Sequence, residues 1–155
     1  METINQKFIA DVHLGKLARY LRLLGFDTLY KNSFTNAELI SIAKEEGRIL
    51  LSRNIAFAKH PVVSSYIVQS EASMTQLKQV VQHFGLKTLI HPFSLCMVCN
   101  GKLETVQKEI IINQLEENTK QYFNKFWQCE NCHQIYWMGS HYERMLLLIG
   151  SVSKE

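Results

Sequence analysis

Two Cys-x-x-Cys motifs constrain this chain more than any other feature of its sequence. Their members are Cys96 and Cys99, then Cys129 and Cys132, and the chain has no other cysteine. Two residues between cysteines let both thiolates of a motif point at one metal ion, so two motifs supply the four sulfur ligands of a tetrahedral zinc site. We therefore predict a structural zinc ion. Because four thiolates leave no open coordination position, we expect the function to lie elsewhere.

Two disulfides or a redox pair are the alternatives for the same cysteines. Disulfides persist in oxidising compartments. The chain opens with Met-Glu-Thr-Ile-Asn-Gln-Lys, which has no apolar signal core. We therefore expect a cytoplasmic, reducing location, where a metal site is favoured over both alternatives.

The spacing of the two motifs is typical of a zinc ribbon. The segment 100–128 between them is longer than in a zinc finger, and it suits two knuckles on hairpins joined by an extended segment. Asn100-Gly101 is a hairpin-turn signal directly after the first knuckle. We predict a ribbon module with a C-terminal helix at 91–150, which begins at the break His91-Pro92. This module is too small to fold on its apolar core alone, so we expect zinc removal to unfold it and to spare the rest.

Residues 1–90 alternate between strand-like and helix-like patterns. Helices between successive strands indicate βαβ units, hence an α/β fold with a parallel sheet and helices on both faces. Thr35 followed by Glu38 is a capping-box signal for the second helix. The predicted strands are 8–10, 28–30, 48–52 and 62–68, and the predicted helices are 14–24, 35–47 and 74–84.

Charge and hydropathy exclude few functions. The formal net charge is only +3, and no run of like charges indicates a nucleic-acid arm. No apolar stretch approaches the roughly 20 residues that span a bilayer, so we expect no membrane partner. The sequence does not indicate an oligomeric state.

Polar residues follow the predicted strands at the edge where parallel sheets bind ligands. Asp11 follows the first strand, and Ser52-Arg53-Asn54 follow the third. Glu38 lies in the first turn of a helix that begins at the same edge. One interpretation is that Asp11 and Glu38 bind a hard cation such as Mg²⁺ or Mn²⁺. The alternative is that both side chains only cap helices.

Several segments together resemble one family. Residues 8–28, FIADVHLGKLARYLRLLGFDT, resemble the opening of PIN-like ribonuclease domains with a C-terminal zinc ribbon, the Mut-seven C-terminal type. Residues 51–54, LSRN, look like that family's Leu-Thr-Arg-Asp motif. The ribbon is similar throughout, in FSLCMVCNGKL at 93–103, FWQCENC at 126–132 and YWMGSHYERM at 136–145.

This resemblance implies a PIN-like fold and a metal-dependent ribonuclease, a hydrolase whose carboxylates bind Mg²⁺ or Mn²⁺. Asp11 and Glu38 match the acidic segments of the family. Asn54 stands where the motif has aspartate, and Asn36 stands where an acidic residue is common. An amide offers a neutral oxygen in place of an anionic one, which weakens the attraction for a cation. Two alternatives to an active enzyme therefore stay open: an RNA-binding module that has lost catalysis, and a zinc-ribbon adaptor that binds a protein partner.

Basic residues near the same edge are candidates for substrate binding. We expect Lys16, Arg19, Arg22 and Arg53 to contact RNA phosphates, while a solvated helix face is the alternative. His13 and Lys59 can add positive charge there. In the ribbon, aromatic residues with cations nearby can either stack on RNA bases or form the core of the module, and we favour the core. They are Phe126, Trp127, Tyr136, Trp137 and Tyr142, with Lys125, His133, His141 and Arg144.

Overall fold

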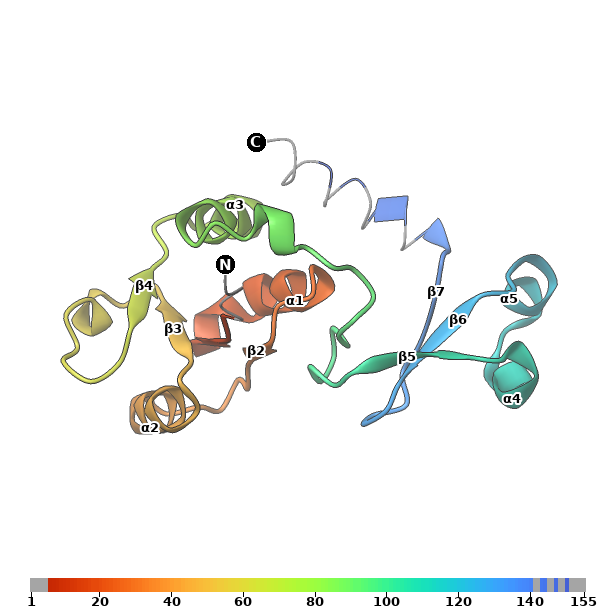
Figure 1. The fold of residues 1–155 in the computed structure, drawn as a ribbon, viewed down its shortest axis with the longest axis horizontal. Coiled ribbons are helices and arrows are strands. Elements are labelled where there is room, and N and C mark those ends of the chain that lie inside the picture. The colour runs from red at the N-terminus through yellow and green to blue at the C-terminus, as the bar shows by residue number, and fades with distance from the viewer. Residues whose placement is uncertain (1–5, 141–142, 145–146, 148–149, 151–155) are drawn as a thin grey trace.

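Four short parallel strands form the N-terminal sheet of the computed structural model, which describes residues 6–140, 143–144, 147 and 150 (Figure 1). Their order is β2-β1-β3-β4, so the first strand lies inside the sheet. The register aligns Ala10 with Leu51 and Leu51 with Tyr66. The strands are β1 (Phe8–Ala10), β2 (Thr28–Leu29), β3 (Ile49–Ser52) and β4 (Ser65–Ile67).

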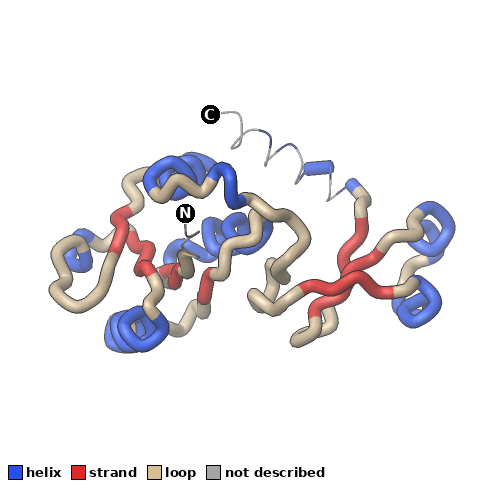
Figure 2. The backbone as a smooth tube through the Cα atoms, viewed as in Figure 1, coloured by secondary structure: helices blue, strands red, loops and turns tan. Residues whose placement is uncertain are grey.

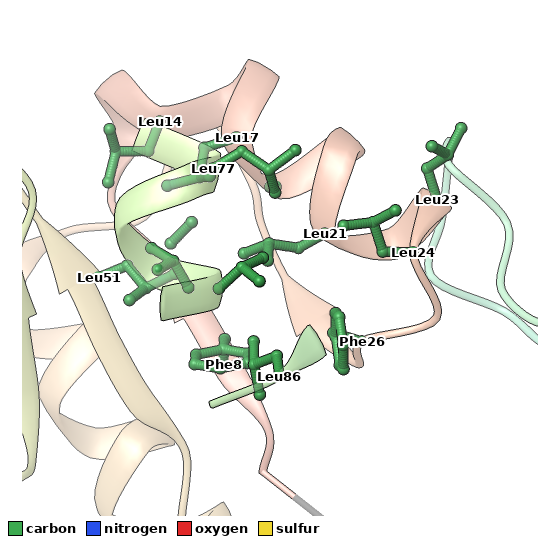
Figure 3. Close-up of a cluster of buried hydrophobic side chains, with 14 of the residues drawn as sticks. Phe8, Leu14, Leu17, Leu21, Leu23, Leu24, Phe26, Leu51, Leu77 and Leu86 are labelled. Carbon is green, nitrogen blue, oxygen red and sulfur yellow. The ribbon is translucent and has the colours of Figure 1, made fainter. Parts of the chain in front are cut away.

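Helices cover both faces of this sheet, as the sequence predicts. α1 (Gly15–Leu23) and α3 (Ser73–His83) pack on one face, and α2 (Asn36–Glu46) packs on the other. Alternate strand residues point to opposite faces. Phe8 therefore joins the cluster under α1 and α3, and its neighbour Ile9 joins the cluster under α2. Figure 3 shows Leu14, Leu17 and Leu21 lying beside Leu77 in the larger cluster.

Two elements in this domain have boundaries that differ from the predicted ones by more than one residue. The predicted helix from 14 begins earlier as a 3₁₀ turn, η1 (Val12–Leu14), because the Asp11 side chain caps it. The predicted strand 62–68 is shortened to β4, and a 3₁₀ turn, η2 (Ile55–Phe57), precedes it. The capping box predicted for α2 is present: the Thr35 hydroxyl accepts from the Glu38 amide, and the Glu38 carboxylate accepts from the Thr35 amide.

The C-terminal module is built on an antiparallel sheet in the order β5-β6-β7. Its strands are β5 (Leu103–Val106), β6 (Phe126–Cys129) and β7 (Ile135–Trp137), and η3 (Lys87–Leu89) precedes the module. The expectation of an extended segment between the knuckles was wrong. That segment contains β5 and then three short helical pieces at the far end of the ribbon (Figures 1 and 2). They are α4 (Lys108–Ile111), η4 (Ile112–Gln114) and α5 (Glu117–Tyr122).

These helical pieces form because they bury apolar side chains that an extended chain would leave exposed. Ile111 and Leu115 pack with Phe126 in a small cluster at the end of the sheet. The predicted C-terminal helix reaches to residue 150 and falls largely outside the described residues. Within the described part of the chain, no helix is long and apolar enough to cross a membrane.

The segment that leads into and carries the first Cys-x-x-Cys motif packs tightly against the α/β domain. Met97, between the first two cysteines, is buried in the cluster beneath α1 and α3. The His91 amide donates to the Leu24 carbonyl at 2.8 Å. A Cβ atom on Gly25, whose φ is +94°, would lie 2.4 Å from the His91 carbonyl oxygen, so this approach requires glycine. The predicted division at His91 therefore falls within a packed junction.

Candidate functional site

The order of the strands puts a topological switch point between β1 and β3, the position at which parallel sheets form a ligand-binding crevice. The chain leaves β1 toward β2 on one side, and it later returns to place β3 on the other side of β1. Connections that diverge in this way open a gap at the carboxyl ends of the two strands, where parallel sheets bind ligands. Asp11 follows β1 and Ser52 ends β3, so both residues lie at this gap.

Asp11 is the most constrained carboxylate at the crevice. It is 7% exposed. Its Oδ1 accepts from the Val12 amide at 2.6 Å, and its Oδ2 accepts from the Ser52 hydroxyl at 2.7 Å. A carboxylate has about four lone-pair sites, so two remain for other partners. Asp11 therefore does cap a turn, and it keeps acceptor capacity for a further partner.

Ser52 and Asn54 continue this network. The Asn54 amide donates to the Ser52 oxygen at 2.9 Å, which orients the hydroxyl toward Asp11. The side chain of Asn54 accepts from the Ala56 amide at 3.0 Å and so caps η2. Asn54 is therefore joined to Asp11 through Ser52, while its side-chain oxygen is already engaged.

Glu38 is exposed, and its carboxylate closes the capping box of α2. Hydrogen bonds from the backbone and side chain of Thr35 hold the pKa of Glu38 below its ordinary value. Among the described residues, only the four cysteines form a group of three or more His, Cys, Asp or Glu side chains close enough to share a metal ion. The helix-capping interpretation of Glu38 is thus observed.

The predicted basic residues have different environments. Lys16 and Arg19 are exposed on α1, and Lys59 is exposed after η2. Lys16 lines a cavity of about 510 Å³ between α1 and α3, together with His13 and Glu71. Arg53, which follows β3, lies 4.0 Å from the carboxylate of Glu71, which follows β4.

Arg22 is 4% exposed and serves the junction instead. Its Nε donates to the Thr28 carbonyl at 2.9 Å, and its Nη1 donates to the carbonyls of Met97 at 3.0 Å and Val98 at 3.2 Å. Burial lowers the pKa of Arg22, and the nearby Cys99 and Cys96 partly offset this effect. Since these carbonyls engage the guanidinium, we leave Arg22 out of the substrate-binding group.

The four cysteines form a site that can hold a zinc ion. Their sulfurs all lie within 4.8 Å of one another, with Cys96 3.7 Å from Cys132 and Cys99 3.4 Å from Cys129. Zinc–sulfur bonds of about 2.3 Å in a tetrahedron separate the sulfurs by about 3.8 Å, so the donor set fits zinc. No disulfide links the cysteines, all of which lie in the described part of the chain.

Residues around the cysteines orient their sulfurs. The Tyr136 hydroxyl lies 3.0 Å from the Cys96 sulfur, and it accepts from the Met97 amide. A Cβ atom on Gly101 would lie 2.7 Å from the Cys129 sulfur, which excludes larger residues there. Burial raises the pKa of the Cys99 thiol, but hydrogen bonds from the Asn131 side chain and the Gly101 backbone outweigh it and bring the pKa to about 6. These hydrogen bonds favour the thiolate of Cys99, whereas burial raises the pKa of Cys132 to about 12.

The aromatic residues of the ribbon pack within it. Phe126 and Trp127 are buried, and Trp127 stacks on Phe93 with ring centroids 4.6 Å apart. Lys125 lies 5.2 Å above the Trp127 ring. The predicted core role is thus confirmed for Phe126 and Trp127. Tyr136 and Trp137 are half-buried, His133 is exposed and Arg144 is exposed, while His141 and Tyr142 lie outside the described residues.

Sequence reasoning missed Glu71 and did not assign the observed roles of Ser52 and Tyr136. Ser52 was placed at the end of the third strand, but its hydrogen bond to Asp11 depends on the register between β1 and β3. Glu71 follows β4 at the same edge of the sheet, a few residues beyond the end of the strand. Tyr136 was assigned to the aromatic core, and no local signal marks its contact with Cys96.

Comparison with known proteins agrees with this architecture. Searches of curated proteins and of solved structures each return no match. A family model described as the Mut7-C RNAse domain matches residues 6–149, which is nearly the whole chain. With a ribonuclease-like α/β module and a four-cysteine ribbon in the order found here, the chain belongs to the Mut7-C RNAse domain family.

Proposed function

We propose that the protein is a metal-dependent ribonuclease of the PIN-like class, with Asp11 as its central carboxylate. The observation that carries this proposal is the position of Asp11 at the gap between β1 and β3, where Ser52 and the Val12 amide fix both oxygens. A buried carboxylate costs free energy unless it is well bonded or binds a cation. Asp11 has the bonds and the remaining lone pairs that a cation needs.

Asp11 would hold Mg²⁺ or Mn²⁺ together with Glu38 and oxygens of the substrate. Mg²⁺ is usually bound through one or two carboxylates plus substrate phosphates rather than by a complete protein cage. A site with few carboxylates is therefore compatible with a cation that binds together with RNA. When bound, the cation would activate a water and stabilise charge on the phosphate.

Positive side chains around the crevice would bind the RNA backbone. Lys16 and Arg19 are exposed on α1, and Arg53 directly follows β3 at the carboxyl ends of the strands. Cations positioned in this way contact phosphates and contribute affinity without reading sequence. The zinc ion in the ribbon would be structural.

An RNA-binding module without cleavage is the second candidate. It is favoured by Asn54, whose neutral side chain caps η2 where a second anionic ligand would strengthen the site. A protein adaptor, which would bind no RNA, is the remaining alternative.

The chain offers a matched test because it has two aspartates, one at the carboxyl ends of the parallel strands and one at their amino ends. Asp11 follows β1, whereas Asp27 precedes β2 and bonds to Arg48. We expect the Asp11→Asn variant to lose about 100-fold or more in Mn²⁺-dependent cleavage of single-stranded RNA. The Asp27→Asn variant should cleave at the wild-type rate.

The Asn54→Asp variant separates the two candidates. Aspartate caps a helical turn as well as asparagine does, so the fold should be retained while the site gains an anionic oxygen. Cleavage should rise, and it should disappear again when Asp11→Asn is added. RNA binding with no cleavage in either wild type or Asn54→Asp would support the second candidate. Absence of RNA binding would support the adaptor.

A further inference from the structure

Three exposed cationic residues follow one another along the solvent side of η1 and α1. They are His13, Lys16 and Arg19. Residues three apart on a helix are neighbours, so these side chains form a row that winds around the helix, with His13 and Arg19 about 120° apart around its axis. The opposite side of α1 is buried, with Leu17 and Leu21 in the core beneath it. Residues 12–26 contain no Asp or Glu, so no carboxylate neutralises the row from within its own segment.

The two faces of the sheet differ in charge. On the face with α1, α3 carries Lys78 and His83 and contains no Asp or Glu. On the other face, α2 carries three glutamates and only one lysine, Lys44. An anionic polymer is therefore attracted to the face of α1 and α3 and repelled by the face of α2.

The row begins at a cavity of about 510 Å³ between α1 and α3. His13 and Lys16 line one side of the cavity, and Glu71 and Met74 line the other. Its volume falls in the range of roughly 300–1,000 Å³ that is usual for small-molecule sites. Since Asp11 directly precedes η1, the cavity adjoins the proposed catalytic crevice. Its lining combines apolar side chains with the basic His13 and Lys16 and with one carboxylate, that of Glu71. Apolar and cationic groups together are found at sites for unpaired nucleotides.

The C-terminal end of α1 lies against the zinc ribbon, although Arg22 at this end is buried and is not a member of the row. Arg22, one turn beyond Arg19, is fixed to the carbonyls of Met97 and Val98 in the first knuckle. Val98 itself is 57% exposed. These bonds hold the end of α1 against the ribbon, so the row has a fixed direction from crevice to knuckle.

We propose that α1 is a track for a single RNA strand, with one unpaired nucleotide in the cavity between α1 and α3 and the backbone along His13, Lys16 and Arg19 toward the zinc knuckle. This inference rests on the proposed function and assigns the substrate as single-stranded on that side of the scissile phosphate. A row one helix wide matches a single backbone, and a base held in a duplex cannot enter the cavity.

Binding measurements test the track without cleavage. A labelled single strand of about ten nucleotides is titrated with protein in buffer without added Mg²⁺ or Mn²⁺, at several salt concentrations. Each of Lys16→Gln and Arg19→Gln should weaken binding by roughly threefold to tenfold and reduce the salt slope by about 0.7. Lys44→Gln on α2 is the matched control and should change neither. Thermal melts confirm that each variant is folded.

Photocrosslinking with 4-thiouridine in the same strand locates the RNA. Crosslinks should fall in residues 13–19 and 71–76, and crosslinks in α2 would overturn the track. Equal effects of Lys44→Gln and Lys16→Gln would also overturn it, as would tighter binding of a duplex or no binding at all. If RNA is cleaved but neither Lys16→Gln nor Arg19→Gln affects its binding, the track is wrong and the ribonuclease proposal stands. If these variants weaken binding but no Mn²⁺-dependent cleavage is seen, the ribonuclease proposal is wrong and the track stands.

Discussion

The α/β domain and the ribbon differ in the interactions that stabilise them. The α/β domain buries apolar side chains on both faces of its sheet, in two clusters. The ribbon has two small clusters, and one of them consists of Leu103 and Trp127 with the ligands Cys96 and Cys129. A core of this size offsets little of the conformational entropy of the chain, so we expect a metal ion on the four cysteines to supply the difference. The first region is held by apolar packing, and we expect the second to be held by metal–sulfur bonds.

Their junction shows that the two regions nevertheless depend on each other. Asn100, directly after Cys99, accepts from the Thr28 amide at 3.0 Å and donates to Asp27 at 2.7 Å. Its side chain thereby satisfies a backbone group of β2, which is an edge strand with no neighbouring strand on that side. The zinc knuckle therefore covers an edge of the sheet in the other domain.

Zinc removal should have the largest effect and tests the difference between the regions directly. Binding of structural zinc is worth on the order of 10 kcal/mol in small modules, so the metal-free ribbon should unfold. Both tryptophans of the chain, Trp127 and Trp137, lie in the ribbon, and their fluorescence reports this region alone. We expect chelation to shift tryptophan emission to the red while most far-UV circular dichroism from the α/β helices remains.

The junction sharpens this prediction. Metal-free protein should also lose about 2–4 kcal/mol of stability in its α/β domain, because the bonds of Arg22 and Asn100 to the knuckle are lost. Urea unfolding followed at 222 nm measures this loss, and added zinc should restore it. An α/β domain with unchanged stability would show that the regions fold independently.

Arg22 should have the next largest effect. The Arg22→Met change keeps the apolar part of the side chain but leaves the carbonyls of Thr28, Met97 and Val98 without their donor. We expect a loss of about 3 kcal/mol in the free energy of unfolding. Arg19→Met, one turn earlier on the exposed side of α1, is the control and should cost less than about 0.5 kcal/mol. Equal losses in urea unfolding would contradict the assigned role of Arg22.

Local signals predicted the elements that depend on local physics. The strands around Ile9 and Leu50 are continuous apolar runs, and the Thr35 capping box begins α2 as expected. Arg22 was placed with the exposed cations because helical spacing sets it beside Arg19. Its true partners, Met97 and Val98, are more than 70 residues away in the chain, and no periodicity in α1 identifies them.

For the candidate site too, the sequence predicted what depends on local signals and missed what depends on long-range contacts. Asp11 and Asn54 were found because strand ends can be recognised from sequence, and topology then gives them a common edge. The hydroxyl of Ser52 that joins them depends on the register between β1 and β3, which sequence does not specify for such short strands. The helices between the knuckles were missed because Ile111 and Leu115 have meaning only with Phe126 beneath them.

Asp27 should have the smallest effect, and it is visible only as a dependence on pH. Burial raises the pKa of Asp27, but hydrogen bonds from Arg48 and Asn100 and the charge of Arg48 outweigh it and hold the pKa below its ordinary value. A group with a lowered pKa in the folded state contributes stability above its unfolded pKa of about 3.9 and loses it as pH falls through the folded pKa. Because the Asp27 side chain is 39% exposed, we expect only about 1 kcal/mol.

The Asp27→Asn variant isolates this contribution from the other acid-sensitive groups. Wild type should be more stable than the variant by about 1 kcal/mol at neutral pH. The difference should shrink as pH falls below about 4, and it should vanish only when pH lies below the lowered folded pKa of Asp27. Loss of zinc in acid affects both proteins and cancels in the difference, which tryptophan emission can verify. A difference that stays constant from pH 7 to pH 3 would mean that the charge of Asp27 does not hold the junction. The contact would then depend on shape alone, since asparagine can still accept from Arg48 and Asn100.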